Sequence, residues 1–143
     1  FSPYNGTYYS VNFNGTSDLV LPSSANYQGG SVFTIEMWVW VSTPATTQLL
    51  ACVPVSGAWQ IQLNGGYVNL GVYAVANSLA SSTAMPAGQW VHLVIVRSGT
   101  GSNQTSIFQN GTRVANGTVS AAFTTTGTLT LGAGDLVTTQ PMT

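Results

Sequence analysis

Apolar and polar residues alternate with a period of two along much of the chain, and no stretch carries the 3.6-residue period of a helix. The two longest alternating runs, residues 33–41 and 90–97, hold Trp within a β-strand pattern. Alternation divides the first run into two sides: Phe33, Ile35, Met37, Val39 and Val41 on one, Thr34, Glu36, Trp38 and Trp40 on the other. Because apolar residues occur on both sides, this run predicts a central strand that is covered on both faces.

Shorter alternating runs predict the remaining strands, at residues 8–13, 19–21, 48–53, 59–63, 67–75, 105–109, 112–115, 118–123 and 128–131. Asn-Gly pairs at 14–15, 64–65, 110–111 and 116–117 predict turns, and residues 23–31 and 77–88 are predicted to be loops. About ten short strands separated by turns are typical of an all-β sandwich. The chain is therefore predicted to form a single antiparallel β-sandwich domain over residues 1–143.

Charged residues make up only 3% of the 143 residues, against about 25% in ordinary soluble domains. The chain has no Lys, and its acidic, basic and imidazole side chains are Asp18, Glu36, His92, Arg97, Arg113 and Asp135. Two Arg cannot neutralise a phosphate backbone or hold an anionic membrane, so nucleic-acid binding and electrostatic membrane attachment are excluded. A net charge of −1 favours association, which suits a virion or filament subunit better than a free cytosolic enzyme.

The chain begins at Phe1 and shows no signal peptide, which indicates a processed product or a fragment. No apolar stretch approaches the roughly 18 residues of a membrane span. Cys52 is the single cysteine, which excludes an intrachain disulfide and a cysteine-based metal site, and we expect its side chain to be a small buried hydrophobe.

Glu36 and His92 are the candidates for catalysis, because each shares a predicted strand face with Trp. Glycoside hydrolysis needs two carboxyl groups about 5–10 Å apart, and the only partners for Glu36 are Asp18 and Asp135, in or beside predicted loops. A lone His without Cys cannot build a zinc site, and no Gly-x-Ser-x-Gly elbow is present. We therefore expect a protein that is not an enzyme, in which Glu36 hydrogen-bonds within the sandwich or pairs with an Arg, and His92 bonds the backbone.

Binding residues have two interpretations. The four Trp side chains are predicted to be core residues: Trp38, Trp40, Trp59 and Trp90. If one of them is exposed near Tyr67 or Tyr73, a site that stacks a sugar ring is expected. No cofactor is expected. Bound Ca²⁺ stays open, with Asp18 and Asp135 as weak candidates that Asn14 assists, because Ca²⁺ prefers several carboxylate oxygens.

Asn-x-Ser/Thr sequons mark possible glycosylation at Asn5, Asn14, Asn103, Asn110 and Asn116. Asn-Gly turns account for Asn110 and Asn116 without any sugar. On an archaeal or eukaryotic surface several of the sequons would be occupied, and the glycans would then provide the solubility that so few charges leave missing.

Six elements in a fixed order carry a resemblance to a known family: 13–15 (Phe-Asn-Gly), 33–39 (Phe-Thr-Ile-Glu-Met-Trp-Val), 57–59 (Gly-Ala-Trp), 90–99, 108–111 and 129–132. Together they resemble laminin-G-like, concanavalin A-like jelly-roll domains. The opening residues 1–4 and 8–11, with Val-Arg-Ser-Gly at 96–99, are similar to copies in phage and marine-virus structural proteins. The resemblance implies a tail-fibre, capsid-fibre or decoration module.

Such copies usually continue with a strand that closes the sandwich, whereas this chain stops at residues 140–143. A missing strand leaves unpaired backbone groups on its neighbour. The strand lies further along a longer polypeptide, comes from a neighbouring subunit, or is replaced by another closure; we favour the first.

The expected function is a non-catalytic virion surface or fibre module that self-associates and presents loops to a host-surface glycan or protein. Its expected location is the virion surface or the extracellular space. The alternatives are a purely structural filament or capsid subunit held by strand exchange, a lectin and, more remotely, a glycosidase.

Overall fold

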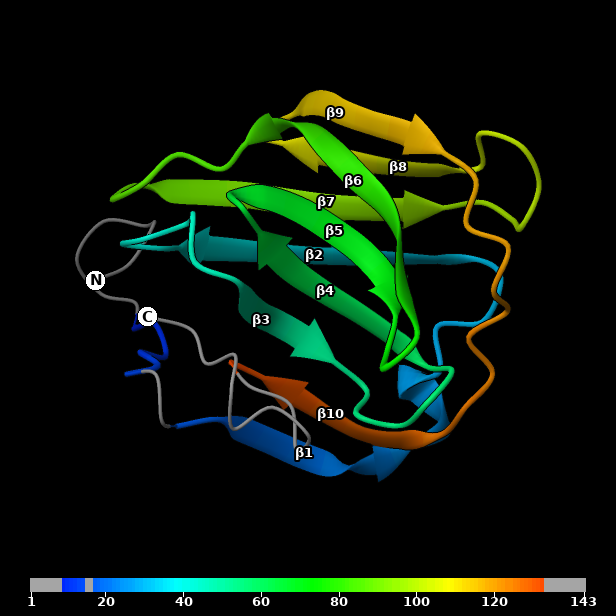
Figure 1. The fold of residues 1–143 in the computed structure, drawn as a ribbon. Helices are drawn as coiled ribbons and strands as arrows, with labels where there is room; N and C mark the ends of the chain where they lie inside the picture. The colour runs from blue at the N-terminus through cyan, green and yellow to red at the C-terminus, as the bar shows by residue number, and fades with distance from the viewer. Residues whose placement is uncertain (1–8, 15–16, 133–143) are drawn as a thin grey trace.

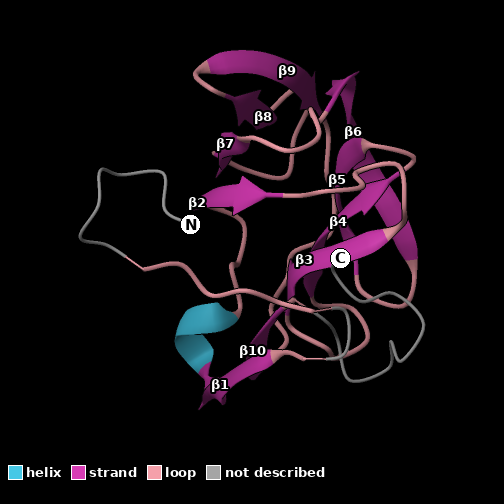
Figure 2. Cartoon of the chain, turned by 90° about the vertical axis from the view of Figure 1, so that its left-hand side faces the viewer, coloured by secondary structure: helices cyan, strands magenta, loops and turns pink. Residues whose placement is uncertain are grey.

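Two antiparallel sheets pack face to face in the computed structural model, which describes residues 9–14 and 17–132 (Figure 1). One sheet has the order β1 (Leu19–Ser24), β10 (Gly127–Leu131), β3 (Gln48–Cys52), β4 (Trp59–Asn64), β5 (Tyr67–Val72) and β6 (Ala76–Ala84). The other has the order β2 (Phe33–Trp40), β7 (Trp90–Arg97), β8 (Thr105–Gln109) and β9 (Thr112–Gly117). Figure 2 shows the two layers from the side, with the short 3-10 helix η1 (Ala25–Tyr27) after β1. The predicted all-β sandwich is confirmed.

The core lies between the sheets and follows the alternation in the sequence. The smaller sheet contributes the buried side chains of Val39, Val91, Leu93, Ile95 and Ile107. The larger sheet contributes Leu50, Ile61, Leu63, Val68 and Leu70. Burial of these aliphatic groups is the main favourable term for the fold. Within the described part of the chain, no helix has the length and hydropathy needed to cross a bilayer.

Three local predictions are wrong: the end of β1, a strand at residues 9–13 and a turn at residues 116–117. β1 continues through Pro22 to Ser24 instead of stopping at Leu21, which is tolerated because β1 is an edge strand. Residues 9–13, predicted as a strand with Tyr8, form none, and Tyr8 lies outside the described residues. The pair at 116–117, predicted as a turn, lies inside β9, where Asn116 pairs with Ser106.

Residues 77–88 were expected to form a loop, but most of them belong to β6. The backbone of β6 pairs with β5, and backbone pairing does not need large side chains. The hydroxyl of Ser81 compensates for an irregular register by accepting from Val68 N at 3.0 Å and donating to Thr83 O at 2.8 Å. Hydrogen bonding at this edge therefore overrides weak strand propensity.

The side chain of Arg97, at the end of β7, organises a segment that was expected to be a strand. Residues 118–123 form no strand; instead, the carbonyl groups of Val119 and Ala121 accept hydrogen bonds from Arg97 Nη2. The guanidinium also lies 4.7 Å from the centre of the Phe123 ring. The cation thus replaces a neighbouring strand as the hydrogen-bond partner of this segment.

The prediction that residues 33–41 form a central strand covered on both faces is wrong. β2 pairs with β7 and is the edge of the four-stranded sheet among the described strands. Its inner side packs on the core, whereas Trp38 and Trp40 on the outer side are 39% and 37% exposed. Alternation assigned the two faces correctly, but the apolar outer side indicated an interior position that the strand does not occupy.

Candidate functional site: a groove along the edge of β2

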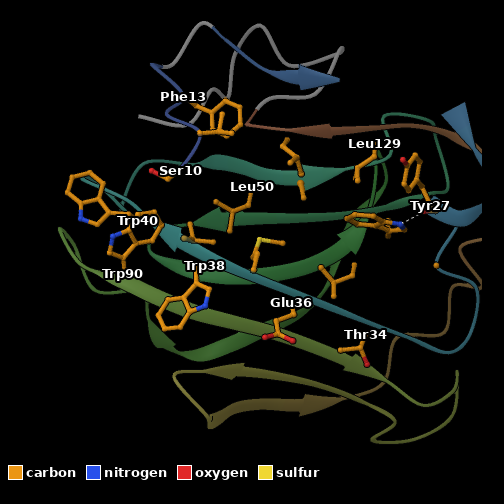
Figure 3. A pocket seen from close by; sticks show the side chains of 18 of the residues that line it. Ser10, Phe13, Tyr27, Thr34, Glu36, Trp38, Trp40, Leu50, Trp90 and Leu129 are labelled. Carbon is orange, nitrogen blue, oxygen red and sulfur yellow. Dashed lines mark hydrogen bonds between the residues drawn. The ribbon is translucent and has the colours of Figure 1, made fainter. Parts of the chain in front are cut away.

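A groove of about 1010 Å³ follows the edge of β2 (Figure 3). β2 contributes both of its faces, because the groove wraps around the strand edge. The floor of the groove is apolar and includes Leu50 of β3 with Leu129 and Leu131 of β10. Residues 9–13 and η1 form the rim. The groove therefore combines an apolar floor with an aromatic outer wall.

Three Trp side chains build the outer wall, and the antiparallel register explains their grouping. Trp40 of β2 is directly opposite Trp90 of β7, and Trp38 is directly opposite His92. Residues that face each other across two strands project from the same face. The Trp38 and His92 rings are stacked, with centroids 5.0 Å apart and an interplanar angle of 29°. The aromatic groups therefore form one surface rather than separate contacts.

Glu36 supplies the polar group of this surface. Its Oε1 lies 2.7 Å from Nε2 of His92, and its side chain is 63% exposed. An exposed pair of this kind adds little to stability, about 0–1 kcal/mol. Its effect is to orient the His92 ring against Trp38. The second carboxylate oxygen makes no hydrogen bond to any described residue, so it is free to accept one from a ligand.

The ring of His92 is not bonded to the backbone as expected. Glu36 contacts Nε2, while the backbone N–H of His92 donates to Oδ1 of Asn110 at 2.9 Å. The expectation that Glu36 bonds within the sandwich is confirmed, and its partner is His92.

Trp59 lines the groove from the larger sheet and is fixed there. Its Nε1 donates to the carbonyl of Tyr27 at 2.6 Å, shown as a dashed line in Figure 3. Gly29 lies against Trp59 with φ +79°, a conformation that favours Gly. η1 and the loop after it are thereby held beside the groove.

The structure separates the four residues that were proposed as a stacking site. Trp38 and Trp40 line the groove, but Tyr67 is on β5 of the other sheet and Tyr73 is buried with Leu49 and Cys52. Neither Tyr belongs to the groove. Cys52 is fully buried, as expected. Trp90 was missed as a site residue, although its place opposite Trp40 follows once the two runs are paired in antiparallel register.

The groove offers one carboxylate, Glu36, among its described lining residues, whereas glycoside hydrolysis needs two. Asp18 is exposed before β1 and does not line the groove, and Asp135 lies outside the described residues. Asn14 Oδ1 accepts from Ser17 Oγ at 2.9 Å. Within the described ranges, no group of three His, Cys, Asp or Glu could hold a metal ion. The described arrangement provides stacking surfaces and a hydrogen-bond acceptor.

The described sequons differ in how their side-chain amides are used. Asn116 Nδ2 donates to Asn103 O at 3.2 Å and to Ser106 Oγ at 2.9 Å. Among the described contacts, Asn110 uses only its Oδ1, toward His92 N, and both Asn103 and Asn110 are exposed. Asn14 is exposed as well, and Asn5 lies outside the described residues.

Two antiparallel sheets in this arrangement define a jelly-roll β-sandwich of the concanavalin A-like class. The family model Laminin_G_3, described as the concanavalin A-like lectin/glucanases superfamily, matches residues 13–142. The chain belongs to this superfamily. This confirms the resemblance to laminin-G-like domains. A comparison with curated proteins found no match.

Proposed function

We propose that this chain is a non-catalytic recognition module of a virion surface or fibre, which binds a neutral glycan in the groove along β2. The observation that carries the proposal is the pair of exposed rings, Trp38 and Trp40, beside the solvent-facing carboxylate of Glu36. Indole faces pack against the C–H faces of sugar rings, and a carboxylate accepts hydrogen bonds from hydroxyl groups.

The spacing of the two rings favours an extended ligand. Trp38 and Trp40 are two residues apart on one strand, which separates their Cα atoms by about 7 Å along β2. Trp90 extends the aromatic surface across to β7. An oligosaccharide that lies along the strand would contact more of this surface than a monosaccharide.

The charges of the groove favour a neutral ligand. Its described lining residues include no Lys, Arg or His, and Glu36 is their only carboxylate. An anionic glycan would find no cationic partner in this lining and would be repelled by Glu36. Neutral sugars meet no such penalty.

The virion setting is supported by composition and by the resemblance to phage and marine-virus structural proteins. With a net charge of −1 and 3% charged residues, the chain is suited to association with its own copies or other subunits. Assembly on a particle would present many weak glycan sites at once, and multivalent display raises the overall affinity.

A second candidate is the structural subunit that exchanges strands with its neighbours. The edge position of β2 and the apolar floor of the groove favour it, because an added strand would gain both backbone hydrogen bonds and buried area. A cryo-EM map of the native particle that carries this chain separates the two functions. A neighbouring strand seated along β2 would support the structural subunit; a groove open to the outside would support recognition.

Glycan binding is tested on an array of neutral and anionic glycans with the wild-type domain, Trp38→Ala and Trp40→Ala. We expect binding to neutral glycans and about a tenfold loss in each variant. Tyr67→Ala is the matched control, since Tyr67 is also an exposed aromatic residue but lies outside the groove. Absence of binding by the wild-type domain, or equal losses in the Tyr67 variant, would contradict the proposal.

A further inference from the structure

We infer that the indole N–H of Trp90 is the hydrogen-bond donor that fixes an oxygen atom of the bound glycan. The inference rests on the proposed function and assigns a specificity-determining residue to it. Trp90 lines the groove, and its Nε1 is a buried atom without a hydrogen-bond partner among the described residues. A buried donor that has lost water and gained no partner is rare in folded proteins and calls for an explanation.

Trp59 is a second Trp of the groove with which Trp90 can be compared directly. Both side chains line the same groove, but Trp59 Nε1 donates to the carbonyl of Tyr27 at 2.6 Å, whereas Trp90 Nε1 donates to no residue in the described part of the chain. The first indole is fixed by the fold itself. The second indole keeps its donor unused, as expected if a ligand completes the hydrogen bond.

Access to the donor depends on Trp40. The two residues are directly opposite each other in the register of β2 and β7, and Figure 3 shows their rings side by side at one end of the groove. Trp40 is on the edge strand and 37% exposed. A sugar that stacks on Trp40 and shifts its ring would expose Trp90 Nε1 to a sugar oxygen.

The positions of donor and acceptor indicate the size and chemistry of the glycan. Trp90 lies opposite residue 40, and Glu36 is four residues earlier on β2, a separation of about 13 Å along the strand. That span exceeds one pyranose ring. The ligand is therefore a neutral oligosaccharide that presents an acceptor oxygen at the Trp90 end and a donor hydroxyl at the Glu36 end.

Trp90→Phe tests the inference, because it removes the N–H and keeps an aromatic ring. The probes are four neutral hexasaccharides, cellohexaose, xylohexaose, mannohexaose and chitohexaose, with affinities measured by titration calorimetry and Tm by differential scanning calorimetry. We expect the variant to bind about tenfold more weakly, a loss of about 1.4 kcal/mol, with a Tm equal to or above that of the wild type.

Trp59→Phe is the matched control for stability, because its N–H is bonded within the fold. Loss of the bond to Tyr27 should lower its Tm by about 3 °C. The affinity control is Tyr67→Phe, which lies outside the groove and should keep an affinity near the wild-type value. Wild-type affinity in Trp90→Phe would overturn the inference and leave the proposed function intact. A Tm for Trp90→Phe below that of Trp59→Phe would also overturn it, because the N–H would then stabilise the free fold. Failure of the wild-type domain to bind any of the four probes or the array would overturn both proposals.

Discussion

Replacing Arg97 by Met removes a buried cation that connects three segments distant in sequence. Its Nη1 donates to Gly30 O at 3.1 Å and its Nε to Gly99 O at 3.1 Å. Its Nη2 donates to Val119 O at 2.6 Å and to Ala121 O. The side chain is 1% exposed and has no carboxylate partner among the described residues, so carbonyl oxygens and the nearby Phe rings stabilise the charge.

The expected loss of stability is about 4 kcal/mol. Each hydrogen bond from a charged donor is worth about 1.5–3 kcal/mol, and the Met variant leaves buried carbonyl groups without a donor. The desolvation of the cation opposes this gain and keeps the net loss below the sum of the bonds. A loss of this size is a large fraction of the 5–15 kcal/mol that stabilises a typical domain.

Desolvation by burial also lowers the pKa of the Arg97 guanidinium below its ordinary value. Because the folded pKa is below the unfolded one, the destabilising effect of burying the charge is fully present below the folded pKa and is relieved only as the pH rises through it. The guanidinium is charged in both states between pH 4 and 9, so its contribution is constant there.

Urea unfolding followed by Trp fluorescence measures the loss, with a fall in Tm of about 12 °C expected in calorimetry. Arg97→Lys should lose about half as much, because an ammonium group cannot reach all the carbonyl groups in the planar geometry of Arg. Arg113→Met is the control: Arg113 is exposed on β9, and the change should stay within about 0.5 kcal/mol. A loss below about 1 kcal/mol for Arg97→Met would refute the reasoning.

Three further predictions follow from described contacts. Gly29→Ala should destabilise the fold by about 2 kcal/mol more than Gly30→Ala in urea unfolding, because both have positive φ but only the Cβ at 29 would meet Trp59 Cδ1, at 3.1 Å. Equal losses of stability in the two variants would contradict this, because backbone strain alone would then account for both. Between pH 5 and 8, and between about 0.05 and 1 M NaCl, Tm should move by less than about 3 °C, because the His92–Glu36 pair is exposed and charges are few; a larger shift would reveal a coupled site. In protein secreted by glycosylating cells, a glycan at Asn110 should leave Tm unchanged, whereas one at Asn116 should lower it by disturbing the bonds to Asn103 and Ser106. Glycopeptide mass spectrometry locates the sugars, and Thr112→Ala, which removes the sequon of Asn110, is the control. A lower Tm in protein with Asn110 occupied would contradict this prediction.

Strands with strong apolar alternation were predictable within one or two residues. Residues 90–97 and 105–109 match β7 and β8, because side chains that face the core must recur at every second position. The sandwich class followed from several such runs with turns between them. The family resemblance rested on the same runs, and the family model matches residues 13–142.

Elements whose partners are backbone groups or remote side chains were not predictable. β6 has few large apolar residues and is held by its pairing with β5, while residues 118–123 have strand-like composition but bond to Arg97. Nothing local in either segment indicates these partners. Their conformation depends on hydrogen-bond donors and acceptors that come close only in the folded chain.

The sequence by itself determined the sheet faces, the aromatic character of residues 38 and 40, and the scarcity of charge. The tertiary structure decided that β2 is an edge strand and that Trp38 and Trp40 face outward. It also decided that Trp90, His92 and Glu36 join them, whereas Tyr67 and Tyr73 do not. The physical reason is that alternation fixes on which side of a strand a residue lies, while exposure and neighbours depend on the order of strands and the register between them.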